Sequence, residues 1–401
     1  MEFKKIQDIE IEIIDGDRGK NYPNGDDFKK EKYCLFLNAK NVTPKGFDFN
    51  ETMFINKEKD KILRKGKLKR NDIVLTTRGT VGNVAYYSDD INYKNIRINS
   101  GMVILRCDNN MILSKYLYYV FKSNYIQGQI KQIKTGSAQP QLPISILKNI
   151  EINMVNFIAQ KKIVNILEKI DKKIEINNQI NNNLHEIAES LFLQIYEKGN
   201  EEKLEKILFE IQTGSRQKGG AVNNGIPSIG AEKIERLGVY DFGSEKYISE
   251  EYYCKMKNGI IKSGDILLYK DGAYTGKVSM ALNDFPHKKC AVNEHVFILR
   301  TEQNWANMFL YFLLHYSKVK EQIISRASSK AAQPGLNQME LKSVVIKLPE
   351  KGLIQKFEHQ IKPIVEKIIQ NSLENKTLIQ LRDTLLPKLM NGEIDLDKIE
   401  I

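Results

Sequence analysis

The sequence predicts an α+β protein with an internal pseudo-twofold repeat. Two mixed, β-rich domains are separated by two long helices that pair as an antiparallel coiled coil. Three observations lead to this prediction. Motifs of the first half recur in the second half at an offset of 193 to 194 residues. Short β-branched and aromatic runs are separated by Gly, Asn and Asp, which is typical of strands and turns. Two long segments place apolar residues at alternating spacings of three and four, the pattern of a coiled-coil seam.

The repeat rests on several matched motifs that share one offset. Chance agreement at so many sites is improbable, so we interpret the pattern as a duplication. The matched pairs are Lys69–Leu75 with Lys262–Leu268, Gly79 and Gly82 with Gly272 and Gly276, Asn99–Arg106 with Asn293–Arg300, and Ser137–Leu142 with Ala331–Leu336.

The two β-rich domains are expected to span residues 1–155 and 199–349. In the first domain, β-branched and aromatic runs predict strands at Ile73–Thr77, Asn83–Tyr87 and Met102–Arg106. The apolar segments Leu113–Phe121 and Met308–His315 are expected to be helices that pack into their respective domains. Each domain is then followed by one of the two long helices.

The long helices are predicted at residues 156–198 and 350–390, before a C-terminal tail at 391–401. Neither Pro nor Gly interrupts the first helix between Phe157 and Tyr196. In the second helix, Pro363 favours a kink or a start at Pro363 itself. Pro387 is expected to end that helix, and Asn391–Gly392 follows as a stop signal. The residues that we expect to form the coiled-coil spacer are Leu167, Ile170, Ile174, Asn177, Asn181, Leu184, Leu191, Ile361, Ile364, Ile368, Asn371, Asn375, Leu378 and Leu385.

Four asparagines interrupt the apolar seam at corresponding positions. Asn177 corresponds to Asn371, and Asn181 corresponds to Asn375. A polar residue in a seam lowers stability but fixes register and partner choice. The alternative is that these asparagines lie at a wet, poorly packed midpoint. The sequence leaves both interpretations open.

Composition excludes several classes of protein and favours a polyanionic partner. No apolar run approaches the ~20 residues that a membrane span needs, and the charged N-terminus lacks the apolar region of a signal peptide. We therefore expect a cytoplasmic protein with no membrane contact. The four cysteines form no CxxC pair and the five histidines show no metal-binding spacing, so no metal site is expected. The net charge of +11 is consistent with nucleic acid as a partner.

At three places the chain resembles the specificity (S) subunit of type I restriction-modification systems. The segment Leu381–Ile394 closely matches the end of that family's distal helix. The motif Gly264–Leu268, followed by spaced glycines, is similar to a recurrent motif of the family's target recognition domains. The order of domain, helix, domain and helix is also the order found in the family.

This resemblance implies a sequence-specific DNA-recognition subunit that has no catalytic activity and needs no cofactor of its own. Each target recognition domain then reads one half of a bipartite site in double-stranded DNA. The helices set the spacer and bind two methyltransferase (M) subunits, which methylate adenine, and restriction (R) subunits complete the complex. The first domain has Arg70–Asp72 where the second has Ser263–Asp265, and it lacks the Thr213–Arg216 loop. We therefore expect the target to be asymmetric.

Candidate DNA-contacting residues come from basic and polar segments, because Lys and Arg pair with phosphates while Ser, Thr and Gln also reach base edges. The alternative for these segments is an ordinary polar loop or a solvated face. The candidates are Lys67, Lys69, Arg70, Thr76, Thr77, Arg78, Lys134, Thr135, Ser137 and Gln139 in the first half, and Ser215, Arg216, Lys218, Lys270, Tyr274, Arg326, Ser328, Ser329, Lys330 and Gln333 in the second.

Two carboxylates and the missing motifs bear on whether the chain is an enzyme. Asp72 and Asp265 precede apolar strands, and we interpret them as turn residues that bond to nearby backbone rather than as catalytic groups. The sequence contains no adenine methylase motif, no glycine-rich cofactor loop and no Walker A loop. An autonomous nucleic-acid enzyme is therefore disfavoured. The remaining alternative is a free-standing, two-headed DNA-binding regulator or architectural protein.

Overall fold

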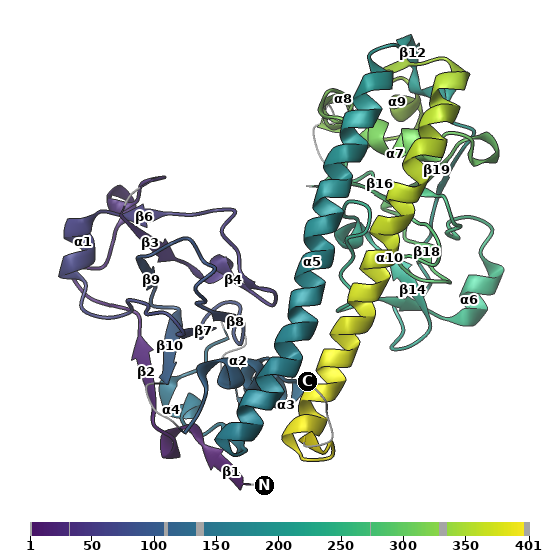
Figure 1. The fold of residues 1–401 in the computed structure, drawn as a ribbon. Coiled ribbons are helices and arrows are strands. Elements are labelled where there is room, and N and C mark those ends of the chain that lie inside the picture. The colour runs from purple at the N-terminus through teal and green to yellow at the C-terminus, as the bar shows by residue number, and fades with distance from the viewer. Residues whose placement is uncertain are drawn as a thin grey trace. The chain divides into compact units, whose positions relative to one another are not determined.

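The computed structural model describes residues 2–31, 33–107, 111–133, 140–272, 274–328 and 335–396. The chain forms two compact units, which do not follow the boundaries expected from the sequence. The first unit comprises Met1–Asp171 with Ile379–Ile401, and the second comprises Lys172–Leu378. The units differ from the expected domains because each long helix contributes one segment to each unit (Figure 1).

The first unit is built around a four-stranded antiparallel sheet that is buried on both faces. Val103 and Leu105 of the third apolar run lie in one hydrophobic cluster, whereas Met102 and Ile104 lie in another. This alternation is the period of two expected for a strand. The sheet has the order β2 (Ile11–Asp15), β10 (Met102–Cys107), β7 (Ile73–Thr76) and β8 (Val84–Tyr86).

Smaller sheets and short helices complete the first unit. A three-stranded sheet has the order β6 (Phe54–Ile55), β3 (Cys34–Leu37) and β9 (Ile96–Ile98), and its β3–β9 pair is parallel. Two further pairs are β1 (Glu2–Lys5) with β11 (Glu151–Met154) and β4 (Val42–Thr43) with β5 (Gly46–Phe47). The helices are η1 (Ile6–Asp8), η2 (Gly25–Asp27), η3 (Ala39–Asn41), α1 (Lys57–Ile62), α2 (Ser114–Lys122), α3 (Asn124–Ile133) and α4 (Ile144–Leu147).

The second unit repeats this plan, which confirms the internal repeat. Its four-stranded sheet has the order β13 (Glu210–Thr213), β19 (Val296–Arg300), β16 (Ile266–Tyr269) and β17 (Val278–Met280). A three-stranded sheet has the order β15 (Tyr247–Ile248), β14 (Ile226–Ile229) and β18 (Ala291–Val292), and β14–β18 is again the parallel pair. A further pair joins β12 (Asn200–Lys203) to β20 (Val345–Leu348).

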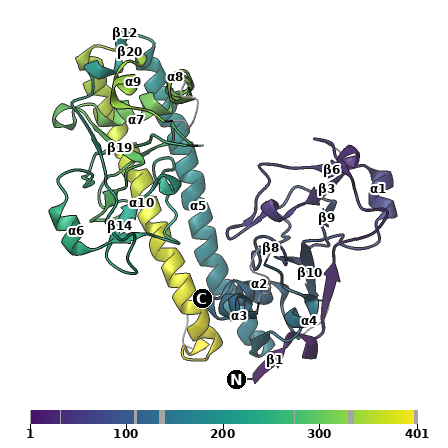
Figure 2. The ribbon, with the colours of Figure 1, turned by 180° about the vertical axis from the view of Figure 1, so that it is seen from behind.

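The helices of the second unit include the apolar helix expected at Met308–His315. This helix is α7 (Asn307–His315), and it is buried in the unit's largest core cluster between the four-stranded sheet and the long helices (Figure 2). The other helices are η4 (Leu204–Lys206), η5 (Ala231–Lys233), α6 (Glu250–Lys255), η6 (Glu302–Asn304), α8 (Ser317–Ser328) and α9 (Gln338–Lys342). In the described ranges, no helix is both long enough and apolar enough to cross a membrane.

The two long helices are α5 (Phe157–Tyr196) and α10 (Lys351–Met390). The expectation that α10 starts at Pro363 or ends at Pro387 is wrong, because the helix continues through both prolines. Phe357 and Ile361 precede Pro363 and are buried in the core of the second unit. Burying two such side chains contributes on the order of 3–6 kcal/mol, which offsets the ~3 kcal/mol cost of an interior proline.

The stop signal after α10 works as the sequence predicts. Gly392 adopts a positive φ of 67°. The N–H of Gly392 donates to the carbonyl of Leu389 at 3.4 Å, and that of Glu393 donates to the carbonyl of Lys388 at 3.0 Å. These two bonds form a Schellman motif, in which glycine tolerates the left-handed conformation that ends the helix.

A half-buried carboxylate on α10 holds the N-terminus of α7 in the second unit. The Oε1 atom of Glu358 accepts a hydrogen bond from the backbone N–H of Phe309 at 2.7 Å. Burial raises the pKa of Glu358 to about 7, although bonds from the backbone of Phe309 and Met308 act in the opposite direction. Glu358 is therefore largely protonated in the folded chain below neutral pH.

We expect Glu358→Gln to flatten the pH dependence of the second unit's stability. The folded chain binds the Glu358 proton more tightly than the unfolded chain, whose pKa is near 4.5. Stability is therefore lost as pH rises from about 4.5 through about 7, by about 3 kcal/mol in all. Glutamine keeps an acceptor for the Phe309 N–H but carries no charge. Thermal melts of both proteins between pH 5 and 8 measure the difference. Glu321→Gln, at an exposed position of α8, is the control and should leave the wild-type slope unchanged.

Candidate functional site

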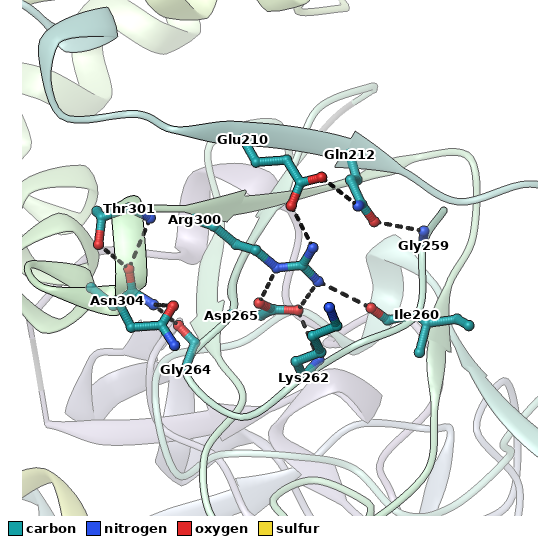
Figure 3. A network of polar contacts seen from close by, with 11 residues as sticks. Glu210, Gln212, Gly259, Ile260, Lys262, Gly264, Asp265, Arg300, Thr301 and Asn304 are labelled. Atoms are coloured by element: carbon teal, nitrogen blue, oxygen red, sulfur yellow. Dashed lines mark hydrogen bonds and ion pairs between the residues drawn. The ribbon is translucent and has the colours of Figure 1, made fainter. Parts of the chain in front are cut away.

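A buried arginine–aspartate pair occupies the same position in both units. In the second unit, Arg300 Nε donates to Asp265 Oδ1 at 2.6 Å and Arg300 Nη2 donates to Asp265 Oδ2 at 2.7 Å (Figure 3). In the first unit, Arg106 binds Asp72 through the same atoms at 2.8 and 2.7 Å. Such two-pronged pairs are among the stronger polar contacts in proteins. The arginine is the next-to-last residue of β10 or the last residue of β19, and the aspartate immediately precedes β7 or β16.

The pair joins three segments of each unit. In the second unit, Arg300 also donates through Nη1 to Glu210 of β13 at 2.6 Å and through Nη2 to the carbonyl of Ile260 at 3.2 Å (Figure 3). The hydrogen bond to Asp265 is the largest influence on Arg300 and raises its pKa. Arg106 likewise donates to the carbonyl of Lys67 at 3.2 Å. These contacts fix the segment before each central strand and identify the pair as structural.

The structure refines the interpretation of Asp72 and Asp265 as turn residues. Asp72 accepts a hydrogen bond from the N–H of Lys69 at 2.7 Å, and Asp265 accepts one from Lys262 at 2.8 Å, as a turn residue does. Sequence reasoning missed the arginine partners. The signal was present, because both matched apolar runs end in arginine at the same aligned position.

The loop that follows β2 corresponds to the loop that follows β13, which corrects the expectation that the first domain lacks it. Asp15 and Thr213 are the last residues of these strands and pair with Val103 and Phe297. A glycine follows each of them at a place where no side chain fits. A Cβ atom on Gly16 would lie 2.0 Å from the carbonyl oxygen of Asn99, and one on Gly214 would lie 1.7 Å from that of Val292.

An arginine in each of these loops contacts a corresponding turn of its own unit. The turn is Asn99–Gly101 in the first unit and Asn293–His295 in the second. Arg18 Nη2 donates to the carbonyl of Ser100 at 3.4 Å, and Arg216 Nη2 lies 2.6 Å from Glu294 Oε1. Sequence comparison missed Arg18 because the offset is 198 residues here instead of 193 to 194. A glycine and an arginine two residues apart after a strand in each half would have revealed the match.

In the first unit, the candidate DNA-contacting residues fall into exposed and structural groups. Lys69 and Arg78 are exposed. Lys67 is half-exposed and forms an ion pair with Asp60 at 2.6 Å. Arg70 donates to the carbonyl of Ile91 at 3.0 Å and stacks on the Tyr87 ring at 4.2 Å, so it supports the fold.

Thr76 and Thr77 are buried, and Thr76 Oγ1 donates to the carbonyl of Thr80. Neither threonine offers a surface for base contact. Lys134, Thr135, Ser137 and Gln139 lie outside the described residues.

In the second unit, most candidates near the strand ends are accessible. Ser215, Arg216, Lys218 and Ser328 are exposed, and the Tyr274 ring is 61% exposed. Lys270 forms an ion pair with the adjacent Asp271 at 2.6 Å. Arg326 bonds to Ser343 and to the carbonyl of Gln322, so it braces α8. Ser329, Lys330 and Gln333 lie outside the described residues.

The seam asparagines are buried and bonded to one another, which favours the register interpretation over a wet midpoint. All four are at most 8% exposed. Asn177 Nδ2 donates to Asn375 Oδ1 at 2.9 Å, and Asn371 Nδ2 donates to Asn181 Oδ1 at 2.8 Å. If α10 were shifted along α5 by one heptad, Asn177 could lie opposite Ile368. Buried amide groups would then lack hydrogen-bond partners, at a cost of about 1–3 kcal/mol for each group. The two layers therefore specify the antiparallel register. The remaining spacer residues are all buried or half-buried.

No metal site is evident in the part of the chain that the structure describes. None of these residues form a group of three or more His, Cys, Asp or Glu side chains that could hold an ion. His287 bonds to Glu245 at 2.9 Å, and the Cys290 thiol bonds to the carbonyl of His287. The His287 ring and the Cys290 thiol, which a zinc site here would need as ligands, are thus engaged in other contacts.

Comparisons with known proteins agree on one family. The model of the type I restriction modification DNA specificity domain matches residues 1–186 and 203–383. The specificity subunit of the type I restriction enzyme MjaIX from Methanocaldococcus jannaschii is 27% identical over 393 residues, which cover 89% of this chain and 87% of that protein. The specificity subunit of the HindI enzyme from Haemophilus influenzae is 23% identical over 456 residues, covering 94% and 98%. The crystal structure of a type I restriction-modification S subunit from M. genitalium superposes with a TM-score of 0.55 at 16% identity, over 97% of this chain and 95% of that one.

Proposed function

The chain belongs to the type I restriction-modification DNA specificity family, and we propose that it directs methyltransferase and restriction subunits to an asymmetric, bipartite DNA target. The chain is the non-catalytic DNA-recognition subunit of such a complex, and each unit reads one half of the target. The observation that carries this proposal is the duplicated unit, which twice presents a loop with an exposed arginine beside the end of its four-stranded sheet. A cytoplasmic location follows from the proposed target, since the DNA and the partner subunits are there.

Differences between corresponding loops support an asymmetric target. The turn Asn99–Gly101 of the first unit corresponds to Asn293–His295 of the second, so Ser and Gly stand where the second unit has Glu and His. Carboxylates and imidazoles offer different hydrogen-bonding groups to a base edge than serine or glycine do. The first unit also contains the β4–β5 hairpin, for which the described part of the second unit shows no counterpart. The two units should therefore prefer different half-sites.

The helices supply the spacer and the surface for partner subunits in this proposal. The buried asparagine layers fix the register in which α5 and α10 pair, and this support for a fixed spacer is part of the proposal. Ile176, Ile180 and Ile187 follow one face of α5 and are each more than a third exposed. Exposed apolar side chains at helical spacing are typical of a surface that a partner covers. We assign this face to a methyltransferase subunit.

Methylome sequencing tests the function directly. A host that expresses this chain with the methyltransferase encoded beside it is compared with a host that expresses the methyltransferase alone. We expect a new, bipartite, adenine-methylated motif that depends on this chain. If the methyltransferase is present and no such motif arises, the specificity role is contradicted. The free-standing regulator then predicts tight, specific DNA binding by the isolated chain.

Exchange of one domain tests the assignment of half-sites to units. Replacing residues 1–155 with the corresponding domain of another family member should change one half of the methylated motif and leave the other half and the spacer unchanged. The reason is that each unit has its own sheet and its own hydrophobic core. The same methylome measurement gives the answer. A change in both halves would contradict independent reading by the two units.

A further inference from the structure

Two loops of the first unit meet through glycines at the end of its four-stranded sheet. Gly16 follows β2, and Gly66 lies in the segment that leads to β7. Gly66 has a φ of 79°, and a Cβ atom on it would lie 3.2 Å from the Cα atom of Gly16. A side chain on Gly66 would therefore press on the Gly16 loop, and a Cβ atom on Gly16 would lie 2.0 Å from the carbonyl oxygen of Asn99. The glycines thus bring the backbones of two distant segments together.

A buried carboxylate ties these two loops to each other. Asp17 is 7% exposed. Its Oδ1 atom accepts the N–H of Arg18 at 2.8 Å, and its Oδ2 atom accepts the N–H of Arg64 at 2.5 Å. Burial alone would raise the pKa of Asp17, but the hydrogen bonds from the backbone of Arg64, Arg18 and Lys65 lower it overall. The carboxylate is therefore ionised at neutral pH and holds Arg18 and Arg64 side by side.

The side chains around this brace line a positively charged hollow. Its volume is about 170 Å³, and its lining residues are Asp17, Arg18, Lys20, Asn21 and Arg64. Arg18 is exposed and lies 3.1 Å from Asp15. Within the ranges that the structure describes, Lys20 and Arg64 form no ion pair with a carboxylate. The hollow contains three cations and one buried carboxylate whose oxygens already accept backbone hydrogen bonds.

The second unit builds the same two-loop contact with different residues. A Cβ atom on Gly259 would lie 2.6 Å from the Cα atom of Gly214, and Gly259 has a φ of 85°. The N–H of Gly259 donates to Gln212 of β13 at 3.1 Å (Figure 3). Cations again flank the contact. Arg216, Lys218 and Lys257 stand where the first unit has Arg18, Lys20 and Arg64, and all six side chains are exposed.

We propose that the hollow formed by Arg18, Lys20 and Arg64 holds a backbone phosphate of the DNA target, and that Arg216, Lys218 and Lys257 hold a second phosphate in the same way. This inference rests on the proposed DNA-recognition function. Arginine and lysine side chains are donors only, and a hollow lined by three of them suits an anion whose position does not depend on base sequence. The duplicated clamp thus positions each unit on the DNA, while neighbouring loops read the bases.

Salt-dependent DNA binding by the full chain with its methyltransferase subunits tests this proposal. The probes are a duplex that contains the target found by methylome sequencing and a scrambled duplex. We expect R18Q/R64Q to weaken binding to both duplexes by roughly tenfold at ~0.15 M salt, and to reduce the slope of log K against log [salt] by ~0.9 for each phosphate that the variant no longer neutralises. R216Q/K257Q should behave in the same way. The control K94Q/K148Q removes the same charge from exposed positions elsewhere on the first unit and should leave the slope within experimental error.

The variant Asp17→Ala distinguishes an effect of net charge from an effect of arginine positioning. Removing this carboxylate makes the surface more positive, so electrostatics alone predicts tighter binding and a steeper slope. If Asp17 positions Arg18 and Arg64, the variant should instead bind both duplexes more weakly.

These binding measurements test the phosphate clamp and the proposed function separately. The clamp is overturned if R18Q/R64Q matches its control, or if it alters the preference for target over scrambled duplex, because that preference reports base reading. If the unsubstituted complex itself shows no preference, the proposed function fails and the clamp fails with it.

Discussion

Replacing Arg300 with methionine should destabilise the second unit by about 3–5 kcal/mol, because it breaks a buried ion pair and leaves the partner charge behind. Asp265 is only 1% exposed and would keep a single backbone N–H as its hydrogen-bond donor. Arg300 also joins β13 to the segment that precedes β16, so its loss releases both segments. Denaturant unfolding gives the size of the effect, and hydrogen exchange in β16 and β19 locates it.

Two further variants separate the ion pair from its surroundings. Glu210→Gln weakens the contacts of this partly exposed carboxylate to Arg300 Nη1 and Gln212 Nε2, leaves the pair of Arg300 with Asp265 in place, and should cost less than about 1 kcal/mol. The double variant R300M/D265L removes both charges and should recover much of the lost stability, since an apolar pair can replace a buried ion pair. A loss below about 1 kcal/mol for R300M would contradict the structural role assigned here. In that case the pair would be free for another function.

In the first unit, Arg106 and Asp72 occupy the same positions, and we expect Arg106→Met to destabilise that unit in the same way. The pair is duplicated, whereas the exposed loops differ between the units. We infer that the pair maintains the framework that carries the DNA-reading loops of each unit. Local unfolding of one unit should impair one half of the recognised target. The stability of the pair and the specificity of the loops are therefore separate properties of each unit.

Features encoded by local periodicity could be predicted from the sequence. The run Ile73–Thr77 alternates between two buried faces, and the spacer residues from Leu167 to Leu385 follow the seam spacing. The repeat was detectable because the motifs around the central strands keep a constant offset. These patterns depend on neighbouring residues and need no knowledge of distant contacts.

Features that depend on contacts between residues far apart in the sequence were not predicted. Arg106 lies 34 residues from Asp72, and only the recurrence of both residues in the second half links them. Arg18 was missed because the offset between the halves changes near the N-terminus. Thr76 was a candidate DNA contact, but it is the last residue of β7 and is buried. Pro363 was read as a local breaker, whereas the tertiary burial of the preceding residues overrides that tendency.

Removing one heptad from each long helix should shorten the spacer of the methylated motif without changing either half-site. The residues to delete are 172–178 of α5 and the facing 374–380 of α10. Seven residues correspond to ~10 Å of helix at ~1.5 Å per residue, or at most ~3 base pairs at ~3.4 Å each. Because the half-sites also rotate around the DNA with each base pair, we expect a change of about one to three base pairs, measured by methylome sequencing.

The contacts that remain explain why this paired deletion should preserve the coiled coil. A heptad is two turns of a coiled coil, so the seam keeps its orientation. The Asn181–Asn371 layer survives and still fixes the register, and the ion pair of Asp171 with Arg382 at 2.9 Å stays next to it. Deleting residues 172–178 alone leaves the helices unequal and should abolish methylation. The full-length variant N177A/N375A removes the other polar layer and should keep the original spacer. If the paired deletion also kept that spacer, helix length would not be what sets the distance between the half-sites.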